Sequence, residues 1–213
     1  MRRVLGTTGN RDQVLPAWLT QSANRHQYVA IQKRREDVTN PMTIAVALKV
    51  HDGVVLATDS ASTLMGAQPD GSQSVLNVYN NANKIANLLK GSPVGIMTWG
   101  NGAIGAVSAA TIFKDLRAML AGAVPAPDGS DWTVDPTKLD IKLIAERVKA
   151  YVYDTLYVTA IGVQPGAPEM GLLVAGYSAG GTHAELYQID IAAGGTCAGI
   201  RELHPAEECG VTI

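Results

Sequence analysis

The glycine-rich stretch that begins at Gly100 is the first feature of the sequence that could do chemistry. Gly100, Gly102 and Gly105 have the G-x-G-x-x-G spacing of a dinucleotide site, between a predicted strand and a predicted helix. Such a site also needs a second parallel strand ending in an acidic residue about 20 residues further on, but residues 120–135 are a loop rich in proline and glycine. The glycines are better explained by a tight strand-to-helix turn. A nucleotide-binding module is kept as a minor alternative.

Other familiar catalytic and metal-binding patterns are weaker. The four histidines are scattered, and the sequence contains neither H-E-x-x-H nor G-x-S-x-G. Ser178 falls in a predicted hairpin turn, without the helix that a nucleophilic serine needs behind it. Cys197 and Cys209 have no histidines at ligand spacing. We therefore predict no metal, no cofactor and no disulfide, and we expect a reducing cytoplasm as the compartment.

A more informative pattern begins at Thr43, which starts a β-rich run directly after Met42. Asp59 follows sixteen positions later, and Thr63 four positions beyond it. In its residue spacing and its apolar pattern this segment resembles the opening of proteasome β-subunits and of the bacterial HslV-type peptidase. In those proteins a threonine at the mature N-terminus begins a strand. These proteins are N-terminal-nucleophile hydrolases.

The resemblance continues downstream, from Thr43 to about Gly195. Residues 83–85 resemble the family's lysine segment, residues 98–102 its glycine turn into the first helix, and residues 171–177 with 186–190 its later hairpin. It implies Thr43 as the nucleophile, Asp59 and Lys84 as its supporting charges, and the backbone N–H of Gly100 as the oxyanion donor. It also implies peptide binding by Thr63 and a side-chain pocket lined by Thr98.

The implied chemistry is physically sound. A threonine hydroxyl is a poor nucleophile until a base lies beside it, and a free α-amine on the same residue can be that base. The pKa of an ordinary α-amine is about 7.7–8.0, near working pH. A nearby lysine lowers it further, because a second positive charge disfavours the ammonium form. All of this requires Thr43 to be the first residue.

The hydrophobic pattern predicts three hairpins and two helices. Apolar positions at helical spacing predict a helix that covers residues 109–120, and Asp135-Pro136 predicts an N-cap for a second helix whose apolar stripe runs from Ile141 to Val152. We read residues 64–83 as a surface excursion. The order of strands, strands, helix, helix and strands predicts an α+β fold. The predicted strands are 43–50 and 54–59, 84–88 and 94–99, and 172–177 and 185–190.

The resemblance implies that this α+β fold is a four-layer αββα sandwich. The near-continuous apolarity of the first two strands predicts that both of their faces are covered. The family, however, continues beyond the point where this sequence stops, through further helices and strands that hold an additional catalytic-site aspartate and serine. We therefore expect a domain over 43–213 that is truncated at its C-terminus, with one sheet face left uncovered and apolar.

Residues 1–41 form a predicted N-terminal extension. They carry an excess of four positive charges, and the amino-acid composition changes sharply from polar to apolar at Met42. The family's propeptides are usually cleaved after glycine, whereas Met42 precedes Thr43 here. If translation begins at Met42, methionine removal exposes Thr43, and residues 1–41 are a mis-assigned start. If they stay attached, they acylate the amine and abolish the base.

Composition excludes several other classes. A net charge of −2 argues against nucleic acid, and no apolar run of 18 residues predicts a membrane span. The resemblance implies a cytoplasmic threonine endopeptidase that acts on peptides or unfolded proteins as part of a homo-oligomeric ring, with an ATP-dependent unfoldase as a further partner. The rival interpretation is a non-catalytic proteasome-like subunit in which Thr43 never becomes terminal.

Overall fold

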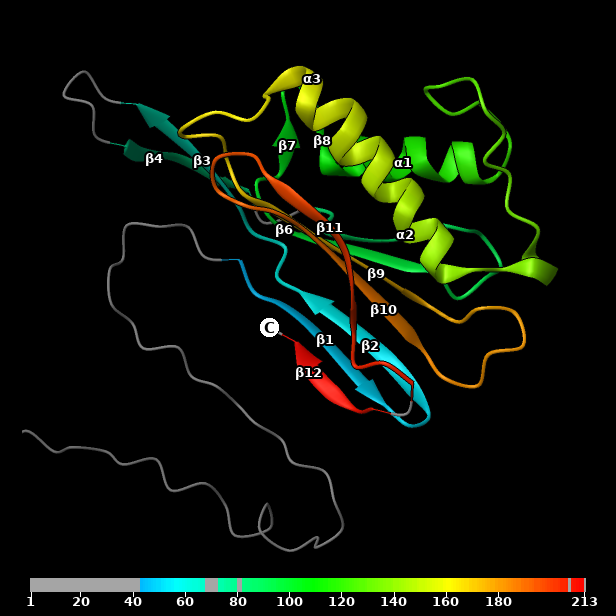
Figure 1. Cartoon of the computed structure of the whole chain (residues 1–213). Coiled ribbons are helices and arrows are strands. Elements are labelled where there is room, and N and C mark those ends of the chain that lie inside the picture. Colours follow the sequence, from blue (N-terminus) through cyan, green and yellow to red (C-terminus); the bar gives the residue numbers. More distant parts are fainter. Residues whose placement is uncertain (1–42, 68–72, 80–81, 207, 213) are drawn as a thin grey trace, which may run out of the picture. The chain divides into compact units, whose positions relative to one another are not determined.

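The structure is a computed structural model, and it describes residues 43–67, 73–79, 82–206 and 208–212. The predicted extension over residues 1–41 lies outside the described residues. Within the described part, the fold is mixed α+β and its sheets are antiparallel (Figure 1). The predicted α+β class is therefore confirmed.

The first sheet contains the strands that flank Thr43 and Asp59. Strands β1 (Ala45–Val50) and β2 (Gly53–Thr58) form an antiparallel hairpin about a turn at His51 and Asp52, as predicted from the Asp-Gly turn signal. Strand β12 (Gly210–Thr212) pairs with the other edge of β1, so the order is β12-β1-β2. No sequence signal predicted β12.

The second sheet has five strands in the order β11-β10-β9-β6-β5. Its central strand β9 is buried at every residue, as expected for a strand with layers on both faces. The predicted hairpins correspond to β5 with β6 and to β9 with β10, whereas β11 was not predicted. The strand bounds are Ile85–Asn87 (β5), Gly95–Gly100 (β6), Met170–Gly176 (β9), Glu185–Ile191 (β10) and Cys197–Leu203 (β11).

Helix α1 (Ala109–Leu120) buries the whole predicted apolar stripe and is capped by Ser108, whose side chain accepts a hydrogen bond from the Thr111 N–H. The second predicted helix begins later than expected. Asp135 caps only a 3₁₀ turn, Pro136–Lys138, and α2 (Ile141–Lys149) starts after a separate cap at Asp140. The N-cap signal at Asp135 was correct, but its turn does not continue into the helix.

The helix after Lys149 changes its winding. Residues Ala150–Tyr157 form a π-helical segment, which continues into the short helix α3 (Val158–Ala160). The Thr155 hydroxyl donates to Ala150 O, and Lys149 pairs with Asp154 at 2.9 Å, so both contacts join residues five apart. Val152 and Tyr157 are buried at the same spacing. A pattern read with a period of 3.6 residues did not predict this segment.

The prediction of a surface excursion without strands over residues 64–83 is wrong for the described residues there. The expected surface excursion contains a hairpin of β3 (Ser62–Ala67) with β4 (Gln73–Tyr79), whose register joins Ser62 to Tyr79 and Thr63 to Val78. Val75, Leu76 and Val78 are exposed, so burial contributes little to this pairing. A second small hairpin, β7 (Ala103–Ile104) with β8 (Val107–Ser108), leads into α1.

The five-stranded sheet separates two apolar cores. Ile96 of β6 and Leu172 of β9 contact the helices, whereas their neighbours Met97 and Leu173 face the β1–β2 hairpin. Side chains alternate between the faces of a strand, so these two strands support both layers. Helices, second sheet and first sheet thus pack in succession, and the described residues show no helical layer outside the first sheet.

The outer face of the first sheet is apolar and exposed. Ala45 and Ala47 of β1 point inward, whereas Ile44 and Val55 are 58% and 56% exposed. Val211 of β12 is also exposed. The prediction that both faces of β1 and β2 are covered is wrong for the described residues, and the expectation of an uncovered apolar face is met there. Among those residues, no helix is long and apolar enough to cross a membrane.

One lysine is buried between the sheets. The Lys49 side chain follows Ala45 and Ala47 inward, and its residue is only 3% exposed. Its ammonium donates to His204 O at 2.6 Å and to Ala206 O at 2.8 Å. Both acceptors have positive φ, 50° and 51°, which is costly for residues other than glycine. Lys49 therefore holds the turn that returns the chain from β11 to β12.

Replacing Lys49 by methionine should destabilise the fold. The substitution keeps the length of the side chain but removes both hydrogen bonds from a charged donor, so the free energy of unfolding should fall by about 1–3 kcal/mol. Urea denaturation measures this change. The exposed Lys90 is the control, since Lys90→Met should stay within about 0.5 kcal/mol of the wild type. Equal stability of Lys49→Met and Lys90→Met would contradict the assignment.

Candidate functional site

Three side chains that the sequence analysis singled out meet at one point. The Lys84 Nζ lies 2.8 Å from Asp59 Oδ1 and 3.2 Å from Thr43 Oγ1. The ammonium donates to both, since a charged lysine has donors only. Lys84 therefore joins the hydroxyl of the predicted nucleophile to a carboxylate.

Strand ends bring these residues together. Thr43 precedes β1 and Asp59 follows β2, and the Asp59 N–H donates to Ile44 O at 3.0 Å, which extends the hairpin by one pair. Lys84 precedes β5 of the other sheet, and its carbonyl accepts from the Thr98 N–H at 2.8 Å. The cluster thus spans the two sheets at a shared edge.

A second backbone contact holds the segment that carries Lys84. The Ala82 N–H donates to Ser60 O at 2.9 Å, so the chain just before Lys84 is fixed to the chain just after Asp59. The ion pair therefore links two segments whose main chains are already joined. This reduces the backbone entropy that must be lost to bring the two charges together.

The ion pair is partly shielded from water. The side chains of Lys84 and Asp59 are 11% and 25% exposed. Salt screens such a pair less than a fully exposed one, and the remaining exposure leaves the pair in contact with solvent. The hydroxyl of Thr43 accepts from Lys84, so its own proton can still be given to a base. Within the full-length chain the nitrogen of Thr43 is an amide, which is not a base.

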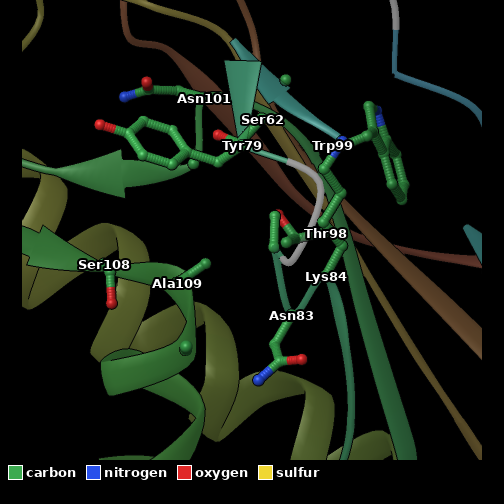
Figure 2. A pocket seen from close by; sticks show the side chains of 13 residues that line it. Ser62, Tyr79, Asn83, Lys84, Thr98, Trp99, Asn101, Ser108 and Ala109 are labelled. Carbon is green, nitrogen blue, oxygen red and sulfur yellow. The ribbon is translucent and has the colours of Figure 1, made fainter. Parts of the chain in front are cut away.

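Beside this cluster lies a cavity of about 290 Å³. Figure 2 shows its lining side chains, which come from the start of β3, the end of β4, the approach to β5, the end of β6 and the beginning of α1. Lys84 belongs to both the cluster and the cavity wall. The lining residues are Ser62, Tyr79, Ala82, Asn83, Lys84, Thr98, Trp99, Gly100, Asn101, Gly102, Ser108, Ala109 and Ala110.

Gly100 ends β6 in a conformation that favours glycine. Its φ is +76°, and a Cβ placed there would lie 2.8 Å from the carbonyl oxygen of Glu169 on the neighbouring chain segment. The Asn101 N–H donates to Glu169 O at 2.9 Å, so Gly100 and Met170 form a non-hydrogen-bonded pair of the ladder. The Gly100 N–H therefore points away from β9, toward the side of β6 where Lys84 lies.

The two predicted substrate-binding threonines have different surroundings. Thr98 lines the cavity, and its hydroxyl donates to Gly171 O at 2.9 Å, which fixes the buried side chain. Thr63 is paired with Val78 in the β3–β4 hairpin and is not part of the described cavity wall. Its neighbour Ser62 lines the cavity instead.

Sequence reasoning missed the contribution of the hairpin. Ser62 and Tyr79 both reach the cavity because β3 and β4 pair in a register that sets Tyr79 opposite Ser62. The β-branched and aromatic residues Val75, Val78 and Tyr79 are the signal that could have suggested a strand.

The glycine-rich stretch after β6 does not have the surroundings of a dinucleotide site. Both neighbours of β6, strands β5 and β9, run antiparallel to it, so the parallel pair of such a site is missing there. Residues 103–108 form the β7–β8 hairpin in place of a direct turn into α1. Among the described residues, no three His, Cys, Asp or Glu side chains are grouped so that they could hold a metal ion.

Comparison with known proteins gives no assignment: no known protein family matches the chain, and no curated protein sequence matches it.

Replacing Gly100 by alanine should destabilise the fold by more than backbone strain alone. Positive φ costs an alanine about 1–2 kcal/mol. At Gly100 the contact with Glu169 O adds to this cost. Gly91 is the matched control, because its φ is +84° and no atom lies within 4 Å of the position that a Cβ would take. Chemical denaturation should show a greater loss for Gly100→Ala than for Gly91→Ala, and equal losses would contradict the close approach.

Proposed function

We propose that this chain is a threonine-type peptidase or amidohydrolase subunit, with Thr43 as its N-terminal nucleophile once residues 1–42 are removed. The observation that carries the proposal is the contact of Lys84 with both Thr43 Oγ1 and Asp59 Oδ1. A hydroxyl, an ammonium and a carboxylate from three separate strand ends meet beside a cavity that can receive part of a substrate. Their grouping agrees with the roles that the resemblance implies.

In this proposal the free α-amine of Thr43 takes the hydroxyl proton as Oγ1 attacks the substrate carbonyl carbon. Lys84 keeps positive charge beside the amine and the hydroxyl, which favours the neutral amine, and Asp59 holds Lys84 in place. The Gly100 N–H, on the Lys84 side of β6, would donate to the oxyanion, and one such donor commonly contributes about 10²–10³ in rate.

The tetrahedral intermediate collapses with transfer of the proton from the α-ammonium to the leaving amine. The C–N bond breaks, and the acyl group remains on Oγ1 as an ester. Water then attacks the ester carbonyl with the α-amine as base, which releases the carboxylic acid and restores Thr43. Apart from the peptide, water is the only reactant that the two steps consume.

The four-layer αββα arrangement is part of this proposal as well. The two sheets would be the inner layers of an αββα sandwich, and α1 and α2 would be one of its outer layers. The exposed β3–β4 hairpin would carry Thr63 beside an extended peptide, whose main chain adds to a strand edge. A homo-oligomeric ring, an unfoldase partner and a cytoplasmic site of action would follow from the same resemblance.

The proposal is tested by the N-terminus of the untagged protein from its native source. Intact mass and N-terminal sequencing should find a chain that begins at Thr43, and that chain should cleave peptides. Thr43→Ala in the same chain should reduce cleavage by at least about 10³-fold, since the nucleophile is lost. A chain that begins at Met1 and cleaves nothing would overturn the proposal in favour of a non-catalytic subunit.

Lys84 and Asp59 should affect the rate without being needed for the fold. In the chain that begins at Thr43, Lys84→Gln should lower kcat/KM by about 10²-fold or more, and Asp59→Asn should lower it by less, because Lys84 keeps its contact with the hydroxyl. Lys90→Gln, on an exposed turn, is the matched control. Peptide hydrolysis and thermal melts of the variants separate the two effects, and unchanged kcat/KM in Lys84→Gln would rule out this role.

A further inference from the structure

The base of the β3–β4 hairpin forms one wall of the cavity. Ser62 and Tyr79 are register partners at the open end of this hairpin, and both line the cavity. Figure 2 shows the Tyr79 side chain on the same side of the cavity as Ser62 and Asn101. A Cβ added at Gly102 would lie 3.7 Å from Ser62 Oγ, so the Ser62 hydroxyl faces the glycine turn across this wall.

The polar groups of the cavity differ in how far they are already used. The Asn101 amide donates to Ala103 O, and the Ser108 hydroxyl accepts from the Thr111 N–H. In contrast, within the part of the chain that the structure describes, the side chains of Ser62 and Tyr79 make no hydrogen bond. Two hydroxyls at the hairpin base are therefore available to a ligand, and each can donate and accept.

The charges around the cavity argue against a charged occupant. Among the described lining residues, Lys84 alone is charged, and its ammonium is engaged by Asp59 and Thr43. A basic side chain would find no carboxylate in the wall and would meet an ammonium of like sign. An acidic side chain would compete with Asp59 for Lys84, which the proposed catalytic arrangement requires.

The dimensions suit a single side chain. At about 290 Å³ the cavity is at or just below the lower end of the range found for small-molecule sites, and small residues form the wall from α1. Lys84 connects this space to Thr43 Oγ1, 3.2 Å from its Nζ. A side chain in the cavity would thus belong to the substrate residue whose carbonyl Thr43 attacks.

We propose that the cavity binds the carboxamide side chain of glutamine or asparagine, and that Tyr79 with Ser62 determines this specificity. A carboxamide is uncharged and offers one acceptor and two donor hydrogens, which two hydroxyls can pair. The inference rests on the proposed function, because it assigns the residue whose carbonyl Thr43 attacks.

The test measures binding, which does not depend on cleavage. Short peptides that are identical except for a C-terminal Gln, Leu, Lys or Glu are titrated into the full-length chain and into Tyr79→Phe by calorimetry. The Gln peptide should bind about tenfold or more tightly than the other three, since a site built to hydrogen-bond a group rejects an analogue without it. Tyr79→Phe should reduce the preference for Gln over Leu by about three- to tenfold, the effect of one hydrogen bond.

Tyr177→Phe is the matched control. Tyr177 is half-buried in the core between the two sheets, away from the cavity wall, so this variant should keep the wild-type preference for Gln. Equal binding of Gln and Leu peptides, tighter binding of the Lys or Glu peptide, no binding of any peptide, or an unchanged preference in Tyr79→Phe would each overturn the proposal.

Failure of this inference can be distinguished from failure of the proposed function. Cleavage by the chain that begins at Thr43, without preference for the residue before the scissile bond, would leave the peptidase in place and remove the carboxamide site. Selective binding of the Gln peptide without any cleavage would do the reverse.

Discussion

The contacts of the Lys84 ammonium with Asp59 and Thr43 connect the two sheets at the candidate site. The proposed chemistry depends on them. It contacts Asp59 after β2 and Thr43 before β1, while its own backbone is paired with β6. A buried or partly buried charge needs a partner, and here the partner lies in the other sheet. The apolar core between the two sheets must therefore form before the three side chains can meet.

The cores meet this requirement through strands that are covered on both faces. β6 and β9 alternate their side chains between the helices and the β1–β2 hairpin, so one sheet supports both layers. At its end, β6 passes close to Glu169 through the positive φ of Gly100, and this turn opens the cavity beside Lys84. Near the other end of β1, Lys49 stabilises the first sheet, because its ammonium fixes the turn that leads to β12.

Sequence alone predicted the parts with strong local signals. The Asp-Gly turn predicted the β1–β2 hairpin, and the apolar stripe of α1 was correct at every position. The β3–β4 hairpin was missed because polar residues and glycines dominate the composition of residues 64–83. The apolar residues of β4 stay exposed, so no alternation of apolar and polar residues was needed there. The spacing of Thr43 and Asp59, and the resemblance of residues 83–85 to the family's lysine segment, predict the three residues of the cluster. Their contact depends on how two sheets pack, which local patterns do not encode, and Tyr79 enters the site only through hairpin register.

The influence of Lys84 on the nucleophile is measured by the pKa of the Thr43 α-amine in a chain that begins at Thr43, obtained by NMR titration. An ordinary amino terminus has a pKa of about 7.7–8.0. With the Lys84 ammonium next to Thr43, the pKa of this amine should fall below that range, and it should return to it in Lys84→Met. A value within or above the ordinary range in the wild type, or no change in Lys84→Met, would contradict the account.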